Sequence, residues 1–180
     1  MSIILISGFK RSGKDTVANY ITENYDFNKY AFAQPIKDIS YVMFGWKPED
    51  DEELKEVVDP FWGFSRRQFW QYFGTDWAQY ELPNKFPLFN ERVGRTLWVK
   101  KFEKLYLDTK NNYVISDWRF PFEYEVLKKY KPLRIKVIRN GFSGDGHESE
   151  SYINTMDYDH CIINDSTLEC LKGRIEDVMF

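Results

Sequence analysis

An apolar segment followed by a glycine-lysine loop is the feature that most limits what this chain can fold into. Residues 3–7 read IILIS, a short apolar run typical of a buried strand, and residues 8–14 follow as GFKRSGK. The spacing G-x-x-x-x-G-K between a predicted strand and a predicted helix is the pattern of a phosphate-binding loop, or P-loop. Its backbone N–H groups and the helix N-terminus favour a bound phosphate. The alternative is an ordinary tight turn between strand and helix.

The residue after the P-loop lysine departs from this pattern. Asp15 stands where such loops usually carry Ser or Thr, whose hydroxyl holds Mg²⁺. A carboxylate can also hold Mg²⁺, directly or through water, because this ion prefers oxygen ligands. Thr16 can offer its hydroxyl to a phosphate. We therefore take Asp15 and Thr16 as the candidate metal site, although the sequence leaves open that Asp15 only caps the helix, where negative charge is favourable.

Apolar strands and helices alternate along the chain. Strands are expected at 3–7, 28–32, 113–116, 133–139 and 160–164, and helices at 14–24, 35–44, 65–74, 96–109, 121–131 and 167–179. This alternation predicts an α/β fold in which crossover helices connect the strands of a parallel sheet.

Three segments between these elements have their own signals. Ser65 is expected to cap the start of the helix at 65–74, and Gly74 is expected to end it. The acidic stretch 47–59 is expected to be an exposed loop with a short helix. Residues 81–95 contain two prolines and are expected to be irregular.

The composition excludes several classes of protein. The chain has 180 residues, of which 43% are hydrophobic, enough for one domain with a sizeable core. A formal net charge of −3 argues against a nucleic-acid partner, because such surfaces are basic. No apolar run is long enough for a membrane span and no secretory signal is evident. Cys161 and Cys170 lack metal-ligand spacing and are expected to be reduced thiols of a cytoplasmic protein.

A second group of polar residues follows the strand expected at 113–116. Ligands of open α/β sheets bind beyond the carboxyl ends of the strands, so Asp117 and Arg119 are expected at the same edge as the P-loop. Asp117 could order water around Mg²⁺ or receive a proton, and Arg119 could hold a second phosphate group. The alternative is an ion pair that only shapes the turn.

A third group lies at the start of the helix expected at 65–74. Arg66 and Arg67 oppose the helix dipole unless they meet an anion. Arg67 shares a helix face with Trp70 and Gln71, so this face offers a cation, a ring and an amide together. The alternatives are a solvated basic turn and, for Trp70, a place in the core.

Several blocks in this order are similar to one known family. They read GFKRSGKDTVANYI, SRRQFWQYFGTDW, VISDWRFPFE, HESE and IINDSTLECL. Together they resemble the bacteriophage- and virus-type deoxynucleoside monophosphate kinases, in which Gly-Lys-Asp-Thr is a family trait. The resemblance implies a three-layer α/β/α P-loop NTPase fold with a parallel five-stranded sheet, in a single domain spanning 1–180. Its expected parts are a core at 1–34, 96–139 and 159–180, a helical nucleoside monophosphate region at about 35–95 and a short lid at about 140–152.

The resemblance also implies the ligands, ATP with Mg²⁺, and the residues that hold them. The expected ATP-binding residues are Gly8, Lys10, Arg11, Ser12, Gly13, Lys14, Asp15, Thr16, Asn164 and Asp165. The expected acceptor-binding residues are Arg66, Arg67, Trp70, Gln71, Asp76, Arg119 and Glu123. The expected catalytic residues are Lys14, Asp117 and Arg139. His147 in the lid is either solvent-exposed or part of the site.

The implied function is ATP-dependent phosphorylation of deoxynucleoside 5′-monophosphates to diphosphates, in nucleotide metabolism for DNA synthesis. The partners would be small nucleotides, in the host cytoplasm if the protein is viral, and the aromatic-rich segment 61–77 permits a homodimer. One alternative is a P-loop kinase for another small acceptor, such as dephospho-coenzyme A. Another is a nucleotide-dependent switch without kinase activity.

Overall fold

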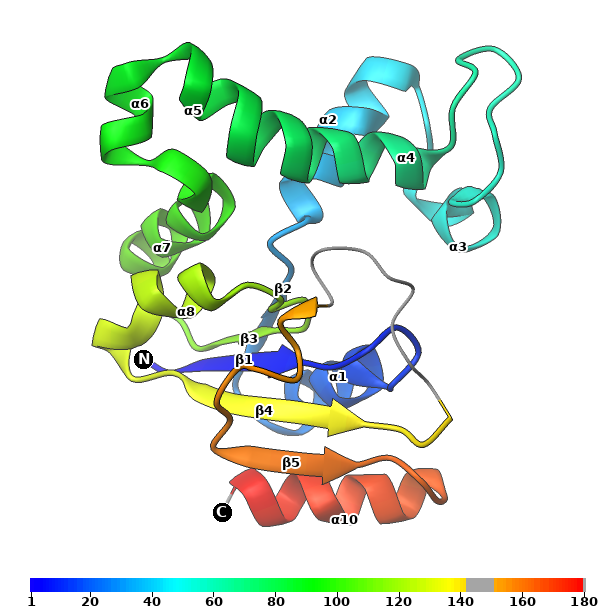
Figure 1. The fold of residues 1–180 in the computed structure, drawn as a ribbon. Helices are drawn as coiled ribbons and strands as arrows, with labels where there is room; N and C mark the ends of the chain where they lie inside the picture. Colours follow the sequence, from blue (N-terminus) through cyan, green and yellow to red (C-terminus); the bar gives the residue numbers. More distant parts are fainter. Residues whose placement is uncertain (142–150, 180) are drawn as a thin grey trace. The chain divides into compact units, whose positions relative to one another are not determined.

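The computed structural model describes residues 1–141 and 151–179, which form two compact units (Figure 1). The first unit comprises Met1–Phe32 and Phe102–Phe180, and the second comprises Ala33–Lys101. His147 and most of the expected lid lie outside the described residues. Among the helices that the structure describes, none is both long enough and apolar enough to cross a membrane.

The first unit is built on a parallel five-stranded sheet. Its strands are β1 (Ile3–Ser7), β2 (Asn28–Tyr30), β3 (Tyr113–Ile115), β4 (Leu133–Ile138) and β5 (His160–Ile163). Their order is β2-β3-β1-β4-β5, and every neighbouring pair is parallel. In the central β1, Ile4 pairs with Val114 and Leu133, and all five residues are buried. This order and pairing confirm the predicted five-stranded parallel sheet. The central strand is apolar throughout because both of its faces are covered.

Helices cover both faces of this sheet. They are α1 (Lys14–Asn24), α7 (Leu97–Thr109), α8 (Pro121–Leu127) and α10 (Leu168–Met179). Val17 of α1 and Leu171 of α10 belong to one buried cluster with Val114 of β3, and Figure 1 shows α10 along β5. Phe102 of α7 packs its ring against Tyr113, which neighbours Val114 and therefore points to the opposite face. The result is the three-layer α/β/α arrangement.

The second unit is helical. It contains α2 (Gln34–Phe44), α3 (Asp51–Leu54), α4 (Arg66–Gln71), a π-helical segment (Tyr72–Glu81), α5 (Leu82–Lys85) and α6 (Pro87–Arg92). Ser65 caps α4 as predicted, in a capping box with Gln68. The prediction that Gly74 ends this helix is wrong, because the chain continues in π geometry. A Cβ at Gly74 would lie 2.6 Å from Ile36 Cδ1, so the glycine serves close packing rather than termination.

The segment 81–95 is helical rather than irregular, so that prediction is wrong as well. Pro87 stands in the first turn of α6, after the extended Phe86, where a missing N–H has no intrahelical partner to lose. Pro83 lies in α5, which continues directly from the π-helical segment, so this proline does not interrupt the helix either.

Candidate active site

The P-loop joins β1 to α1 at the carboxyl edge of the sheet, and two glycines give it its shape. Gly8 has φ +152°, and a Cβ there would lie 2.3 Å from the carbonyl oxygen of Val137 on β4. Gly13 precedes α1 in the left-handed region, with φ +101°. The Ser12 N–H donates to the Phe9 carbonyl at 3.1 Å and tightens the curl between them. The loop backbone is therefore tightly curled, as a phosphate-binding loop requires.

Lys14 folds back across this loop. Its Nζ donates to the carbonyl oxygens of Gly8 at 2.7 Å and Phe9 at 2.8 Å. The half-buried ammonium group is thus held over the loop instead of extending into solvent. A phosphate group bound by the loop N–H groups would meet this charge directly.

Asp15 is held from two neighbouring strands. Its Oδ1 lies 2.7 Å from Lys29 Nζ of β2 and accepts a hydrogen bond from the Ser116 hydroxyl, just after β3, at 3.1 Å. Partial desolvation by the loop acts to raise the pKa of Asp15, although its side chain is 74% exposed, but the hydrogen bond and charge of Lys29, with Ser116, outweigh it and lower the pKa. Asp15 is therefore ionised at neutral pH. Sequence reasoning missed Lys29 and Ser116, because only the strand order brings them beside α1.

The oxygen donors at the start of α1 suit a magnesium ion. They are the Asp15 carboxylate and the hydroxyl of the exposed Thr16, one residue further along the first turn. Mg²⁺ commonly uses one or two protein oxygens and completes its octahedral shell with water and substrate phosphates. The residues present therefore fit Mg²⁺ bound together with a nucleotide.

Asp117 and Arg119 follow β3, next to the P-loop strand β1 in the sheet, so the expectation about this edge is met. Asp117 Oδ1 accepts the Phe32 N–H at 2.8 Å and ties the segment after β2 to the end of β3. Arg119 has an exposed side chain, while its backbone N–H donates to Glu123. Asp117 therefore has a structural task in addition to any catalytic one.

Glu123 shapes the turn that carries Arg119. It is buried, and its Oε2 accepts the backbone N–H groups of Arg119 and Phe120, both at 2.9 Å. Burial raises the pKa of Glu123 to about 8, although the two N–H groups act to lower it. The carboxyl is thus mostly neutral at pH 7 and faces the protein backbone. This placement argues for positioning Arg119 rather than for contact with an acceptor.

Two residues at the end of β5 differ in how they relate to the P-loop. Asn164 Nδ2 donates to the Ser12 carbonyl at 2.9 Å, and a Cβ on Gly13 would lie 2.5 Å from this nitrogen. Asp165 instead pairs with Arg174 of α10 at 2.7 Å. Asn164 therefore braces the loop backbone, whereas the described contacts of Asp165 are within the last helix. Arg139 is exposed just after β4, at the same edge.

The two adjacent arginines of the second unit have different surroundings. Arg66 Nη1 lies 2.6 Å from Asp51 Oδ1, and the two side chains are only 5% and 8% exposed. Lys37 and Tyr41 share the same carboxylate. Arg66 therefore has a structural role and leaves the candidate acceptor set. Asp51 also corrects the expectation that the whole acidic stretch 47–59 is exposed, because a buried arginine needs a buried partner.

Arg67 is accessible by comparison. Its Nε donates to Glu56 at 2.6 Å, and its side chain is 27% exposed. Trp70 donates from Nε1 to the Ser40 hydroxyl at 2.9 Å, and the ammonium of Lys37 lies 4.7 Å from its ring centroid. Gln71 is half-buried on the same face of α4. The spacing of Arg67, Trp70 and Gln71 places them on one face of α4, and the exposed Asp76 follows in the π-helical segment.

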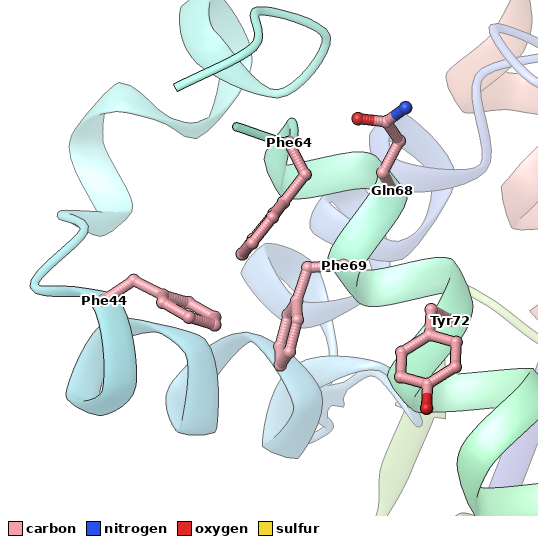
Figure 2. Close-up of a pocket in the computed structure, with 5 residues that line it drawn as sticks. All are labelled: Phe44, Phe64, Gln68, Phe69 and Tyr72. Atoms are coloured by element: carbon pink, nitrogen blue, oxygen red, sulfur yellow. The ribbon is translucent and has the colours of Figure 1, made fainter. Parts of the chain in front are cut away.

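An apolar pocket opens on another side of α4 (Figure 2). It has a volume of about 490 Å³ and is lined by Phe44, Phe64, Gln68, Phe69 and Tyr72. At about 100° per residue, Gln68 and Phe69 lie roughly 100° and 200° around the helix from Arg67, whereas Gln71 lies roughly 40° from it. The pocket is therefore separate from the candidate acceptor residues of this helix.

Comparison with known proteins identifies the family. The model of the deoxynucleotide monophosphate kinase family matches residues 2–59 and 49–175, which is most of the chain. The chain belongs to this family.

Three relatives show how far the similarity extends. A provisionally named deoxynucleotide monophosphate kinase of Acanthamoeba polyphaga mimivirus is 33% identical over 97% of this chain and 94% of its own length. The deoxynucleotide monophosphate kinases of Escherichia phage RB69 and Enterobacteria phage T4 are each 27% identical over 99% of this chain, and the matches cover 100% and 99% of their lengths. Among solved structures, dephospho-CoA kinase from Campylobacter jejuni matches 99% of this chain and 95% of its own, with 14% identity and a TM-score of 0.46.

Proposed function

We propose that this protein transfers the γ-phosphoryl group of ATP to the 5′-phosphate of a deoxynucleoside monophosphate, giving ADP and a deoxynucleoside diphosphate. The observation that carries the proposal is the P-loop with Lys14 folded across it, 2.7 Å from the Gly8 carbonyl, in a chain of this family. The loop supports a triphosphate donor, and family membership supports the acceptor.

The reaction needs positioning and charge neutralisation more than proton transfer. An oxygen of the acceptor phosphate forms a bond to the γ-phosphorus, the bond from that phosphorus to the β–γ bridging oxygen breaks, and ADP leaves. Because the attacking group is already a phosphate, no strong base is required. The loop N–H groups and Lys14 would hold the triphosphate, and Arg139 and Arg119 stand exposed at the same sheet edge to offset charge.

Asp15 and Thr16 are the residues that would hold Mg²⁺, together with oxygens of the nucleotide. When bound, the ion would supply positive charge to the phosphates. In this proposal Asp117 orients water or receives a proton from the acceptor, while its bond to the Phe32 N–H keeps it in place.

For the acceptor, we propose Arg67 of the second unit as the phosphate-binding cation, with Trp70 and Gln71 on the same face of α4. We expect Arg67→Ala to raise the acceptor KM by about 10- to 100-fold, since a charge-assisted hydrogen bond contributes roughly 1.5–3 kcal/mol. The KM for ATP should stay within about 3-fold, because the P-loop residues are unchanged. Steady-state kinetics with each substrate varied in turn measures both constants.

The matched control for this variant is Arg92→Ala, which removes an exposed arginine of the same unit. Its two KM values should equal those of the unmodified chain. An acceptor KM that does not change in the Arg67 variant would remove this residue from the site.

The function itself is tested by ADP release from Mg·ATP with each deoxynucleoside and ribonucleoside monophosphate in turn. Turnover that depends strongly on one or a few deoxynucleotides is the expected result, and it names the base that is accepted. Stimulation by dephospho-coenzyme A alone would favour the other small-acceptor kinase. ATP binding without turnover on any acceptor, together with a stoichiometric protein partner, would favour a switch.

The proposal also covers location and partners. Cys161 and Cys170 are both exposed free thiols, which suits a reducing compartment, and we place the protein in the cytoplasm, of the host if it is viral. We propose nucleotides as its partners and neither nucleic acid nor membrane. The homodimer stays a prediction, to be measured by light scattering.

A further inference from the structure

Lys29 of β2 stands beside the P-loop without belonging to its motif. We propose that Lys29 is a positioning residue that neutralises Asp15 and thereby lets the loop bind ATP before Mg²⁺ contributes its charge. This inference rests on the proposed function, because it concerns how the same loop holds ATP. It assigns a role to a residue that no sequence motif marks.

The geometry ties Lys29 to α1. Its Nζ lies 2.7 Å from Asp15 Oδ1 and donates to Asn19 Oδ1 at 2.9 Å. Asp15 and Asn19 are four residues apart on α1, so they lie on the same helix face. The Ser116 hydroxyl donates at 3.1 Å to the same oxygen of Asp15 that Lys29 binds. The carboxylate is therefore fixed from β2 and from the end of β3, within one compact unit.

The charges explain why the P-loop needs this lysine. Asp15 directly follows Lys14, so a bare carboxylate there would offset the positive charge that Lys14 presents to the nucleotide. With Lys29 paired to Asp15, the three side chains carry a net positive charge; without Lys29 they carry none. A triphosphate is strongly anionic, so this difference in charge should change its affinity even at a partly exposed site.

Magnesium should mask the effect of Lys29. When Mg²⁺ accompanies ATP, it brings its own positive charge next to Asp15 and suits the carboxylate as an oxygen donor. Lys29 then matters less, because Asp15 is already compensated. The inference thus predicts that losing Lys29 weakens the binding of metal-free ATP much more than the binding of Mg·ATP.

The test measures the Kd for ATP by calorimetry, once in EDTA and once in excess Mg²⁺. We expect Lys29→Met to raise the Kd in EDTA by about 5- to 10-fold, the order expected when one charge near a bound triphosphate is removed, and to change the Kd in Mg²⁺ by less than about 2-fold. Lys29→Arg, which keeps the charge, should behave like the unmodified chain. Asp15→Asn should instead lower the Kd in EDTA, because the carboxylate that offsets Lys14 is removed.

Other results would overturn the inference in distinct ways. A loss of affinity of equal size in EDTA and in Mg²⁺ would mean that Lys29 contacts the nucleotide itself. Unchanged Kd values in both conditions would show that the ion pair between Lys29 and Asp15 is only a surface contact between α1 and β2. Absence of ATP binding by the unmodified chain would instead overturn the proposed function, and this inference with it.

Discussion

Lys14→Ala is expected to lower kcat by about 10²- to 10³-fold or more while the protein still folds, because one preorganised charge is removed from the transferred phosphoryl group. The ammonium group lies 2.7 and 2.8 Å from the carbonyl oxygens of Gly8 and Phe9, so its position is set before any ligand arrives. The core cluster of Val17, Ala18 and Ile21 on the buried side of α1 does not involve Lys14. The loss should therefore appear in catalysis far more than in folding.

The measurement is the rate of ADP release at saturating ATP and acceptor, with circular dichroism and a thermal melt to verify the fold. Lys104→Ala removes an exposed lysine from α7 and serves as the matched control, with an expected kcat equal to that of the unmodified chain. A kcat for Lys14→Ala within about 3-fold of the unmodified value would contradict the assignment of this loop.

Gly8→Ala is expected to abolish ATP binding and to destabilise the protein as well. The added Cβ would lie 2.3 Å from the carbonyl oxygen of Val137 and 2.7 Å from Ser12 Oγ. The carbonyl cannot easily retreat, because β4 pairs with β1 on one side and β5 on the other. The loop must move instead, at a φ of +152° that already disfavours a side chain. Strain and overpacking of this kind cost about 1–3 kcal/mol each.

Calorimetric titration with Mg·ATP and chemical denaturation measure the two consequences. Gly173→Ala is the control, because a Cβ at this position of α10 meets nothing within 4 Å. That variant should gain about 0.5–1 kcal/mol of stability, as expected when alanine replaces glycine inside a helix. Normal ATP affinity and an unchanged free energy of unfolding in Gly8→Ala would show that the loop does not depend on this close approach.

Much of the candidate site lies in local sequence and could be predicted from it. The P-loop, its lysine and the helix that follows are contiguous in the chain, so spacing alone predicts Lys14 to Asn24 as α1. Asp117 and Arg119 follow a short apolar strand, and the rule for parallel sheets places them at the ligand edge. In both cases the signal is a pattern of neighbours along the chain.

Glycines and prolines predict the local backbone less well where tertiary packing determines the conformation that they adopt. Gly74 is typical of the end of a helix, but the helix continues, and the missing side chain leaves room for Ile36 to pack closely. Pro83 and Pro87 are residues that commonly break helices, yet Pro83 lies in continuous helical backbone and Pro87 begins α6. Glycine permits many backbone conformations, and proline is compatible with loops as well as with the first turn of a helix, so tertiary contacts decide which conformation is adopted.

Apolar periodicity and short-range spacing are enough to predict the α/β class, the five strands and the strand–loop–helix unit that holds Lys14. Which charged side chains pair with one another follows from the three-dimensional packing. It pairs Lys29 with Asp15 and buries Arg66 against Asp51, while Arg67, one residue further on, stays accessible. The reason is physical: an ion pair forms between side chains that the strand order and helix packing bring within about 4 Å, and no local pattern encodes that distance.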